Sequence, residues 1–275
     1  MSKSWFITGC STGFGRLLAK YVLERGDCVC ATARNLRDIE GLSGADDRLL
    51  RLPLDVTRNA QFGPAAVKAI EKFGRIDVLV NNAGYGYFAL QEDGDIDEIR
   101  RMFETNVFGP IRLTQAFLPH MRRRGGGTIV NLSSVGGRVA FARSGFYSAS
   151  KFGLEALSEA LYHEAGPLGV RVIVIEPGAY ATDFSPRSAV RSPGLDDPKS
   201  PYSGLFAKWT AAAGKMMPAR QDPIEVVEAI VQAVDGGQAF VRIPVGRDAL
   251  ALTQERTSMS DADFMSRMAR RYAEP

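Results

Sequence analysis

Hydrophobic and polar positions follow two alternating patterns along the 275-residue chain. Short apolar runs, which are typical of buried strands, are followed by segments with apolar residues three or four positions apart, as on one face of a helix. The predicted strands are 5–8, 28–32, 49–54, 76–80, 128–132, 170–175 and 239–243. The predicted helices are 14–24, 60–73, a single long helix over 96–121, 146–165, 202–216 and 224–234, with a helical tail to 272.

This alternation predicts the α/β class. Nearly continuous apolar strands separated by helices indicate a parallel sheet covered on both faces, and right-handed crossovers make it a doubly wound sheet, the Rossmann fold. We find no repeat or linker, so residues 1–275 are expected to form a single domain.

Segment 185–220 interrupts the regular pattern. It begins rich in Pro, Ser and Gly and continues with an apolar helical stripe, made by Tyr202, Leu205, Phe206, Trp209 and Met216. We predict a substrate-lid insertion here. The alternative, that this helix only packs on the core or on a second subunit, stays open, because such stripes are usually core.

Composition and charge exclude several classes of protein. Hydrophobic residues make up 45% and charged residues 24%, which is average for globular proteins. The net charge of +3 indicates no nucleic-acid partner. Cys10, Cys28 and Cys30 indicate reduced thiols and a cytoplasmic location, and the isolated His120 and His163 indicate no metal site. Apolar runs are too short for a signal peptide or a membrane helix.

A glycine-rich loop joins the first predicted strand to the first helix. The loop residues are Thr8, Gly9, Cys10, Ser11, Thr12, Gly13, Phe14 and Gly15. Glycines let backbone N–H groups approach a phosphate at the helix N-terminus, so the loop predicts a dinucleotide site. Gly9-x-Ser11-x-Gly13 also fits the nucleophile elbow of serine hydrolases. That alternative is weak, because no earlier strand can supply an oxyanion hole and both histidines fall inside predicted helices.

Tyr147 and Lys151 open a predicted helix four residues apart, on one face. A nearby ammonium lowers the pKa of a phenol, so the pair is expected to transfer a proton between a carbonyl and an alcohol. Ser134 follows the strand 128–132 and could hydrogen-bond the substrate oxygen.

These motifs together resemble the short-chain dehydrogenase/reductase family. The matching motifs are Thr8-Gly9-x-x-x-Gly13-x-Gly15, Asn81-Asn-Ala-Gly84, Asn106, Ser134, Tyr147-x-x-x-Lys151 and Pro177-Gly178, in family order. The resemblance covers about residues 3–182 and extends more loosely to the end of the chain.

The resemblance implies roles for individual residues. Tyr147 would be the general acid/base, Lys151 would lower its pKa and hold the nicotinamide ribose, and Ser134 would orient the carbonyl. Asn106 would support a bound water in a proton relay, or else fill a local hydrogen bond. The remaining cofactor contacts implied are Asp55 and Val56 at the adenine, Asn82, Ala83 and Gly84 along the cofactor, and Pro177, Gly178 and Thr182 near the carboxamide.

The end of the second predicted strand indicates NADP(H). NAD-binding folds usually place an acidic residue there, but this chain has Arg34, whose guanidinium pairs well with a 2′-phosphate. Asp38 argues against this interpretation but lies further along the chain, and Arg37 could assist.

We therefore expect an NADP(H)-dependent oxidoreductase that interconverts a secondary alcohol and a hydrophobic ketone, such as a steroid, a retinoid or an aryl ketone. Tyr85, Tyr87, Phe88, Val139, Phe141 and Phe184 are expected near the substrate. A regulatory protein that senses NADP(H) without turnover is the alternative from another class. The resemblance also implies a homodimer or homotetramer.

Overall fold

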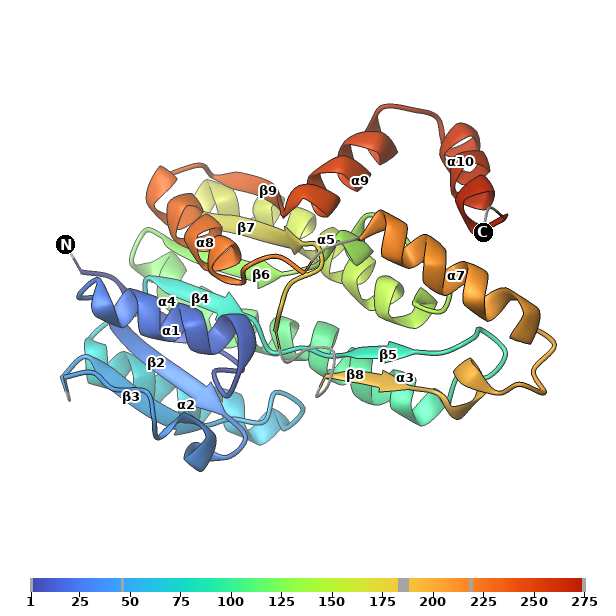
Figure 1. Cartoon of the computed structure of the whole chain (residues 1–275). Helices are drawn as coiled ribbons and strands as arrows, with labels where there is room; N and C mark the ends of the chain where they lie inside the picture. The colour runs from blue at the N-terminus through green and yellow to red at the C-terminus, as the bar shows by residue number, and fades with distance from the viewer. Residues whose placement is uncertain (1, 46, 183–187, 218–219, 274–275) are drawn as a thin grey trace.

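The computed structural model describes residues 2–45, 47–182, 188–217 and 220–273 (Figure 1). Within them lies a seven-stranded parallel sheet in the order β3-β2-β1-β4-β6-β7-β9. The strands are β1 Ser4–Ile7, β2 Cys28–Ala33, β3 Leu49–Pro53, β4 Val78–Asn81, β6 Gly127–Leu132, β7 Val170–Pro177 and β9 Phe240–Val245. This order confirms the predicted doubly wound sheet.

Helices cover both faces of the sheet, which explains why its strands are apolar almost throughout (Figure 1). α1 (Gly13–Glu24) and α8 (Ile224–Gly236) pack on one face. α2 (Asn59–Phe73), α4 (Gly109–Arg123) and α5 (Gly145–Ala165) cover the other. Strand β1 contributes side chains to the apolar cores on both faces of the sheet. Trp5 and Ile7 pack on the face with α1 and α8, and Phe6 packs on the opposite face.

The predicted long helix over 96–121 is divided in the structure. α3 (Ile96–Phe103) is followed by a π-helical turn, Glu104–Phe108, before α4 begins. Asn106 lies in this turn. Its side-chain amide accepts a hydrogen bond from the Tyr85 N–H and donates one to the Tyr85 carbonyl. We attribute the wider turn to this tertiary contact, which helical periodicity cannot reveal.

A small parallel sheet was not predicted. Strands β5 (Gly86–Phe88) and β8 (Ala189–Arg191) pair residue by residue. Each has three residues, too few for a periodic signal. The pairing joins the segment after β4 to the segment after β7, both at the carboxyl edge of the main sheet.

The C-terminal third contains three further helices in the described residues. α7 (Ser203–Met216) confirms the predicted helix of the insertion, and the tail forms two helices, α9 (Arg247–Thr257) and α10 (Asp261–Ala273). α9 and α10 project beyond the sheet, and α7 runs between them and the β5–β8 pair (Figure 1). Leu252, Phe264 and Met268 form a separate apolar cluster with Val135 and Val139.

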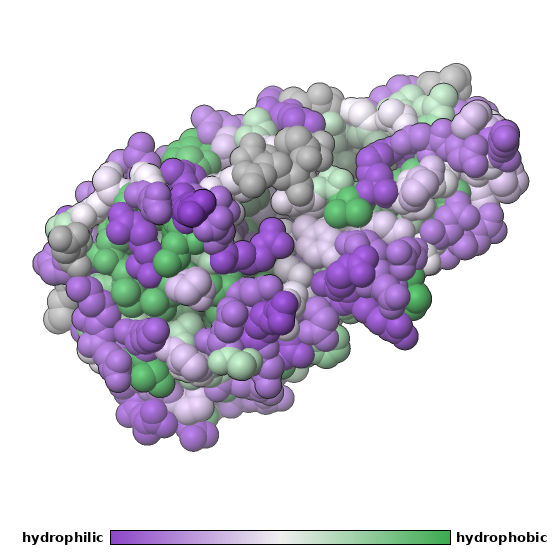
Figure 2. Space-filling model, turned by 90° about the horizontal axis from the view of Figure 1, so that it is seen from below, coloured by the Kyte–Doolittle hydropathy of each residue, from purple (hydrophilic) through white to green (hydrophobic). Residues whose placement is uncertain are grey.

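The face shown in Figure 2 is mainly hydrophilic, with hydrophobic residues in small separate areas. Across the described ranges, we find no helix with both the length and the apolar character needed to cross a membrane.

Candidate active site

A cavity of about 1020 Å³ opens at the carboxyl ends of the parallel strands. Strand order reverses between β1 and β4, and ligands of doubly wound folds bind at such a point. The predicted residues that line the cavity are Gly9, Ser11, Thr12, Gly13, Phe14, Arg34, Asp55, Val56, Asn82, Ala83, Gly84, Ser134, Tyr147, Lys151, Pro177, Gly178 and Thr182. The volume is at the upper end for small-molecule sites, so a dinucleotide and a substrate can share it.

The glycine loop after β1 has the geometry of a phosphate cradle. Gly9 and Gly13 have φ of 71° and 56°, a region that residues with a Cβ rarely adopt. A Cβ at Gly9 would also lie 3.0 Å from the Cα of Ala83. Because the loop leads directly into the N-terminus of α1, its free N–H groups and the helix dipole suit a pyrophosphate. These residues therefore fit a dinucleotide cofactor.

Thr8 and Gly15, also predicted to contact the cofactor, lie behind this loop and outside the cavity lining. The Thr8 hydroxyl accepts hydrogen bonds from the N–H groups of Asn82 and Ala83, both at 3.0 Å, and donates to the Val80 carbonyl. A Cβ at Gly15 would lie 2.5 Å from the Gly9 carbonyl oxygen. Thr8 thus ties the loop after β1 to the loop after β4, and Gly15 lets α1 pack closely against both.

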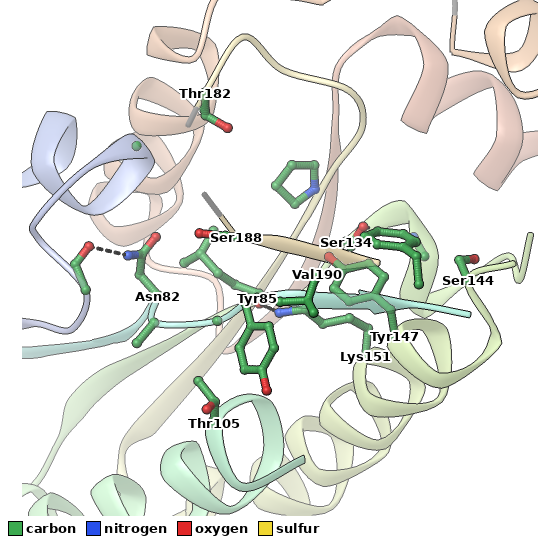
Figure 3. A pocket seen from close by; sticks show the side chains of 18 of the residues that line it. Asn82, Tyr85, Thr105, Ser134, Ser144, Tyr147, Lys151, Thr182, Ser188 and Val190 are labelled. Carbon is green, nitrogen blue, oxygen red and sulfur yellow. Dashed lines mark hydrogen bonds between the residues drawn. The ribbon is translucent and has the colours of Figure 1, made fainter. Parts of the chain in front are cut away.

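Ser134, Tyr147 and Lys151 converge in the cavity, as predicted (Figure 3). Ser134 follows β6 and hydrogen-bonds the Tyr147 phenol, and its Oγ accepts from the Gly136 N–H at 3.0 Å. Tyr147 and Lys151 lie one turn apart near the start of α5. Figure 3 shows Thr182 facing this group from across the cavity.

Burial shifts the pKa values of Tyr147 and Lys151 in opposite directions. Burial raises the pKa of Tyr147 to about 12, opposed by the hydrogen bond with Ser134. The Lys151 ammonium donates to the Leu132 carbonyl at 2.7 Å and lies 5.9 Å from the centroid of the phenol ring. Burial lowers the pKa of Lys151 to about 8, opposed by the charge of Glu155. The phenol is therefore protonated at neutral pH, and Lys151 titrates near neutrality.

Asn106 is predicted in a proton relay but lies outside the cavity lining. It is almost fully buried, at 1% exposure. Its Nδ2 donates to the Tyr85 carbonyl at 2.8 Å and to Ser150 Oγ at 3.0 Å, and its Oδ1 accepts from the Tyr85 N–H at 3.0 Å. Both amide N–H donors are thus engaged, and the Asn106 side chain joins the π-helical turn to Tyr85 and to Ser150 of α5.

The predicted aromatic stripe of α7 does not face the cavity. The rings of Tyr202 and Phe206 pack against Trp209, with centroids 6.1 and 6.0 Å away. The helix instead reaches the cavity through Ala213, and Met217 follows at its end. The predicted face was wrong because helical spacing identifies a stripe but not its partner.

Of the other predicted substrate contacts, some line the cavity and some do not. Tyr85, Phe88 and Phe141 line the cavity, whereas Tyr87 and Val139 are buried in apolar clusters, and Phe184 lies outside the described residues. Sequence reasoning missed several lining residues, which are Thr57, Thr105, Arg143, Ser188, Val190, Arg191, Leu195 and Arg220. No local motif marks these positions.

The hydrolase alternative lacks its base. Ser11 lines the cavity, but neither histidine does. His120 Nε2 accepts from the Ile76 N–H at 3.4 Å, and the ring of His163 lies beside Tyr162.

Comparisons with known proteins identify the family of the chain. The family model of the short chain dehydrogenases matches residues 3–190. The oxidoreductase BOA17 of Botryotinia fuckeliana is 34% identical over 253 residues, covering 91% of both chains. A short-chain dehydrogenase from Streptomyces avermitilis superposes with a TM-score of 0.85 at 36% identity, covering 99% of this chain and 98% of that one. A short chain dehydrogenase from Burkholderia cenocepacia, solved in complex with NADP, has a TM-score of 0.76 at 26% identity, covering 100% and 98%. The chain therefore belongs to the short-chain dehydrogenase/reductase family of oxidoreductases.

Proposed function

We propose that the protein is an NADP(H)-dependent oxidoreductase that interconverts a secondary alcohol and a ketone on a bulky, largely apolar substrate. The observation that carries this proposal is the convergence of Ser134, Tyr147 and Lys151 in the same cavity as the glycine loop and Arg34.

The cofactor half of the cavity has the groups that NADP(H) requires. The glycine loop and the N-terminus of α1 would hold the pyrophosphate, and Arg34 would pair with the 2′-phosphate. Asp55 and Val56 would lie at the adenine, Asn82 to Gly84 along the cofactor, and Pro177, Gly178 and Thr182 near the carboxamide. The bound cofactor supplies the hydride for reduction and takes it up in oxidation. The complex of the Burkholderia cenocepacia relative with NADP supports this choice of cofactor.

Two side chains act on the substrate oxygen, and a third acts on the Tyr147 phenol. Tyr147 donates its phenol proton to that oxygen during reduction and takes it back during oxidation. The Ser134 hydroxyl, already bonded to the phenol, holds the same oxygen in line. The Lys151 ammonium stabilises the negative charge that the phenol oxygen acquires when its proton leaves, and it holds the ribose.

The substrate half favours an apolar substrate. Phe88, Phe141, Val190, Leu195 and Met217 line it. Apolar walls with a few polar groups bind aromatic or alicyclic ketones better than sugars.

Replacement of Tyr147 by Phe tests the proposal. We expect kcat/KM for a panel of aryl and alicyclic ketones with NADPH to fall roughly 10²–10⁴-fold, because the proton donor is lost. NADP(H) binding, measured by fluorescence titration, should persist, because the phosphate cradle is unchanged. Near wild-type turnover in the variant would contradict the mechanism. NADP(H) binding by the wild type without turnover of any ketone or alcohol would favour the regulatory alternative.

A further inference from the structure

The substrate half of the cavity carries a guanidinium that the mechanism does not use. Arg143 lines the cavity and directly precedes α5, four residues before Tyr147. Its φ is 68°, a left-handed conformation that costs about 1–3 kcal/mol outside glycine and persists only where surrounding structure holds it. The carbonyl of Arg143 accepts from the Ala89 N–H at 3.0 Å, which anchors this conformation to the segment after β5. The side chain therefore leaves the cavity wall from a fixed position.

Arg143 forms no ion pair with any carboxylate that the described ranges contain. Its Nη2 donates to the neutral Thr210 hydroxyl of α7 at 3.0 Å. The side chain is partly buried, and burial together with the charge of Arg191 lowers its pKa, against the weaker effect of Asp196. A guanidinium that has lost water without gaining a carboxylate is an unfavourable arrangement, and a bound anion would relieve it.

A second arginine, Arg191, lies on the same wall of the cavity. Arg191, at the end of β8, also lines the cavity and pairs with Asp196 at 2.6 Å. Because Asp196 is exposed and engaged by Arg191, this wall retains a positive charge at Arg143. The same cavity also has apolar lining residues, among them Phe88, Phe141 and Leu195.

We propose that Arg143 binds a carboxylate of the substrate, so that the enzyme acts on oxo acids or hydroxy acids with an apolar body between the carboxylate and the reacting carbon. This inference rests on the proposed function, since it assigns the substrate class of the same site. A planar guanidinium offers paired N–H donors to the two oxygens of a carboxylate. The Thr210 hydroxyl holds the guanidinium without consuming its charge.

A matched ketone series tests the inference. The substrates are 4-acetylbenzoate and 4-(4-acetylphenyl)butanoate, each compared with its neutral methyl ester. For the acid whose length fits, we expect the wild-type enzyme with NADPH to show a kcat/KM at least tenfold above that of the ester. Arg143→Asn should reduce kcat/KM for that acid roughly 10- to 150-fold and leave the ester nearly unchanged. Asn is the suitable replacement because it tolerates a positive φ.

Thr210→Val separates recognition from a purely structural role. It removes the hydrogen bond from Arg143 to α7 and keeps the charge, so preference for the acid should remain. Equal losses for acid and ester in Arg143→Asn, or loss of the preference in Thr210→Val, would overturn the inference. The inference would also be overturned if the wild-type enzyme reduced the esters and showed no higher kcat/KM for either acid.

Equilibrium binding distinguishes this inference from the proposed function. Calorimetric titration of each acid into the protein with NADP⁺ should give a Kd that rises at least tenfold in Arg143→Asn. That result, without turnover of any ketone, would reject the proposed reaction and keep carboxylate recognition. Equal binding to wild type and variant, or no binding to either, would reject recognition by Arg143.

Discussion

At the scale of single residues, burial determines the protonation state of the site. The pKa of Tyr147 rises to about 12, so its proton is present throughout the physiological range. The pKa of Lys151 falls to about 8, because its ammonium is desolvated. Glu155, one turn further along α5, opposes this shift with its negative charge. Lys151 is thus the member of this pair whose charge changes at moderate pH.

We predict that kcat/KM for ketone reduction falls as pH rises through about 8, because Lys151 then loses the charge that stabilises the tyrosinate. Glu155→Gln removes the nearby negative charge, so the pKa of Lys151 should fall and the midpoint of the pH profile should move lower. The measurement is a pH–rate profile of each variant.

Glu159→Gln is the matched control for this prediction. Glu159 also pairs with Arg242, at 2.6 Å, but is exposed and does not contribute to the Lys151 shift. An unchanged midpoint in Glu155→Gln, or an equal change in Glu159→Gln, would contradict the assignment of this titration to Lys151.

At the scale of elements, the ends of the strands decide which side chains meet the ligand. Arg34 directly follows β2 and lines the cavity. Asp38 falls in the following 3-10 turn, Leu36–Ile39, and does not line it, although an acidic residue there could indicate NAD. The Asp38 carbonyl instead accepts from Arg16 at 2.8 Å. The position of each residue relative to the strand end thus favours Arg34 over Asp38 as the residue that faces the cavity.

We predict a lower KM for NADPH than for NADH, and a rise in the NADPH KM of roughly 10- to 150-fold in Arg34→Asp, because attraction to the 2′-phosphate becomes repulsion. Arg37→Asp makes the same change of charge in the adjoining turn, outside the cavity lining, and should have a much smaller effect. Steady-state kinetics with both cofactors provide the measurement. A wild type that favours NADH, or equal effects of the two substitutions, would remove Arg34 as the selector.

At the scale of the whole molecule, a buried charge cluster connects α5, which carries Tyr147 and Lys151, to the edge of the sheet. Arg242 of β9 donates to Glu155 of α5 at 2.8 Å and lies 4.0 Å from Glu176 of β7. Glu176 is 0% exposed and accepts from Arg138 at 3.0 Å. Burial and the charge of Glu155 raise the pKa of Glu176 to about 7. Glu176 immediately precedes Pro177, which lines the cavity at the end of β7.

We predict that Glu176 makes folding depend on pH between its ordinary pKa of 4.5 and its folded value of about 7. Because the pKa of Glu176 is raised in the folded state, its carboxyl contributes its full stabilisation below about pH 4.5. This contribution is lost as pH rises through 7. The amide side chain of the Glu176→Gln variant cannot ionise. As pH rises across that interval, the free energy of unfolding of the variant should therefore increase relative to that of the wild type, by up to about 3 kcal/mol.

Urea denaturation at several pH values measures this difference. Glu159→Gln, in the same cluster but exposed, should keep the wild-type pH profile. Parallel profiles of the wild type and Glu176→Gln would contradict the prediction.

The doubly wound sheet and the central motifs of the site can be predicted from sequence alone. Strands covered on both faces must be apolar throughout, so their alternation with helices is visible in the pattern. The glycines at Gly9 and Gly13 and the spacing of Tyr147 and Lys151 are local features, and local geometry places them correctly.

Which of these residues line the cavity depends on the tertiary structure. Thr8 and Asn106 carry the family pattern, and their side chains form hydrogen bonds to backbone far away in the sequence. The β5–β8 pairing, the direction of the α7 stripe and the place of Arg143 depend on contacts between segments far apart in the chain. Periodicity reports which side of an element is apolar, and only packing decides what that side contacts.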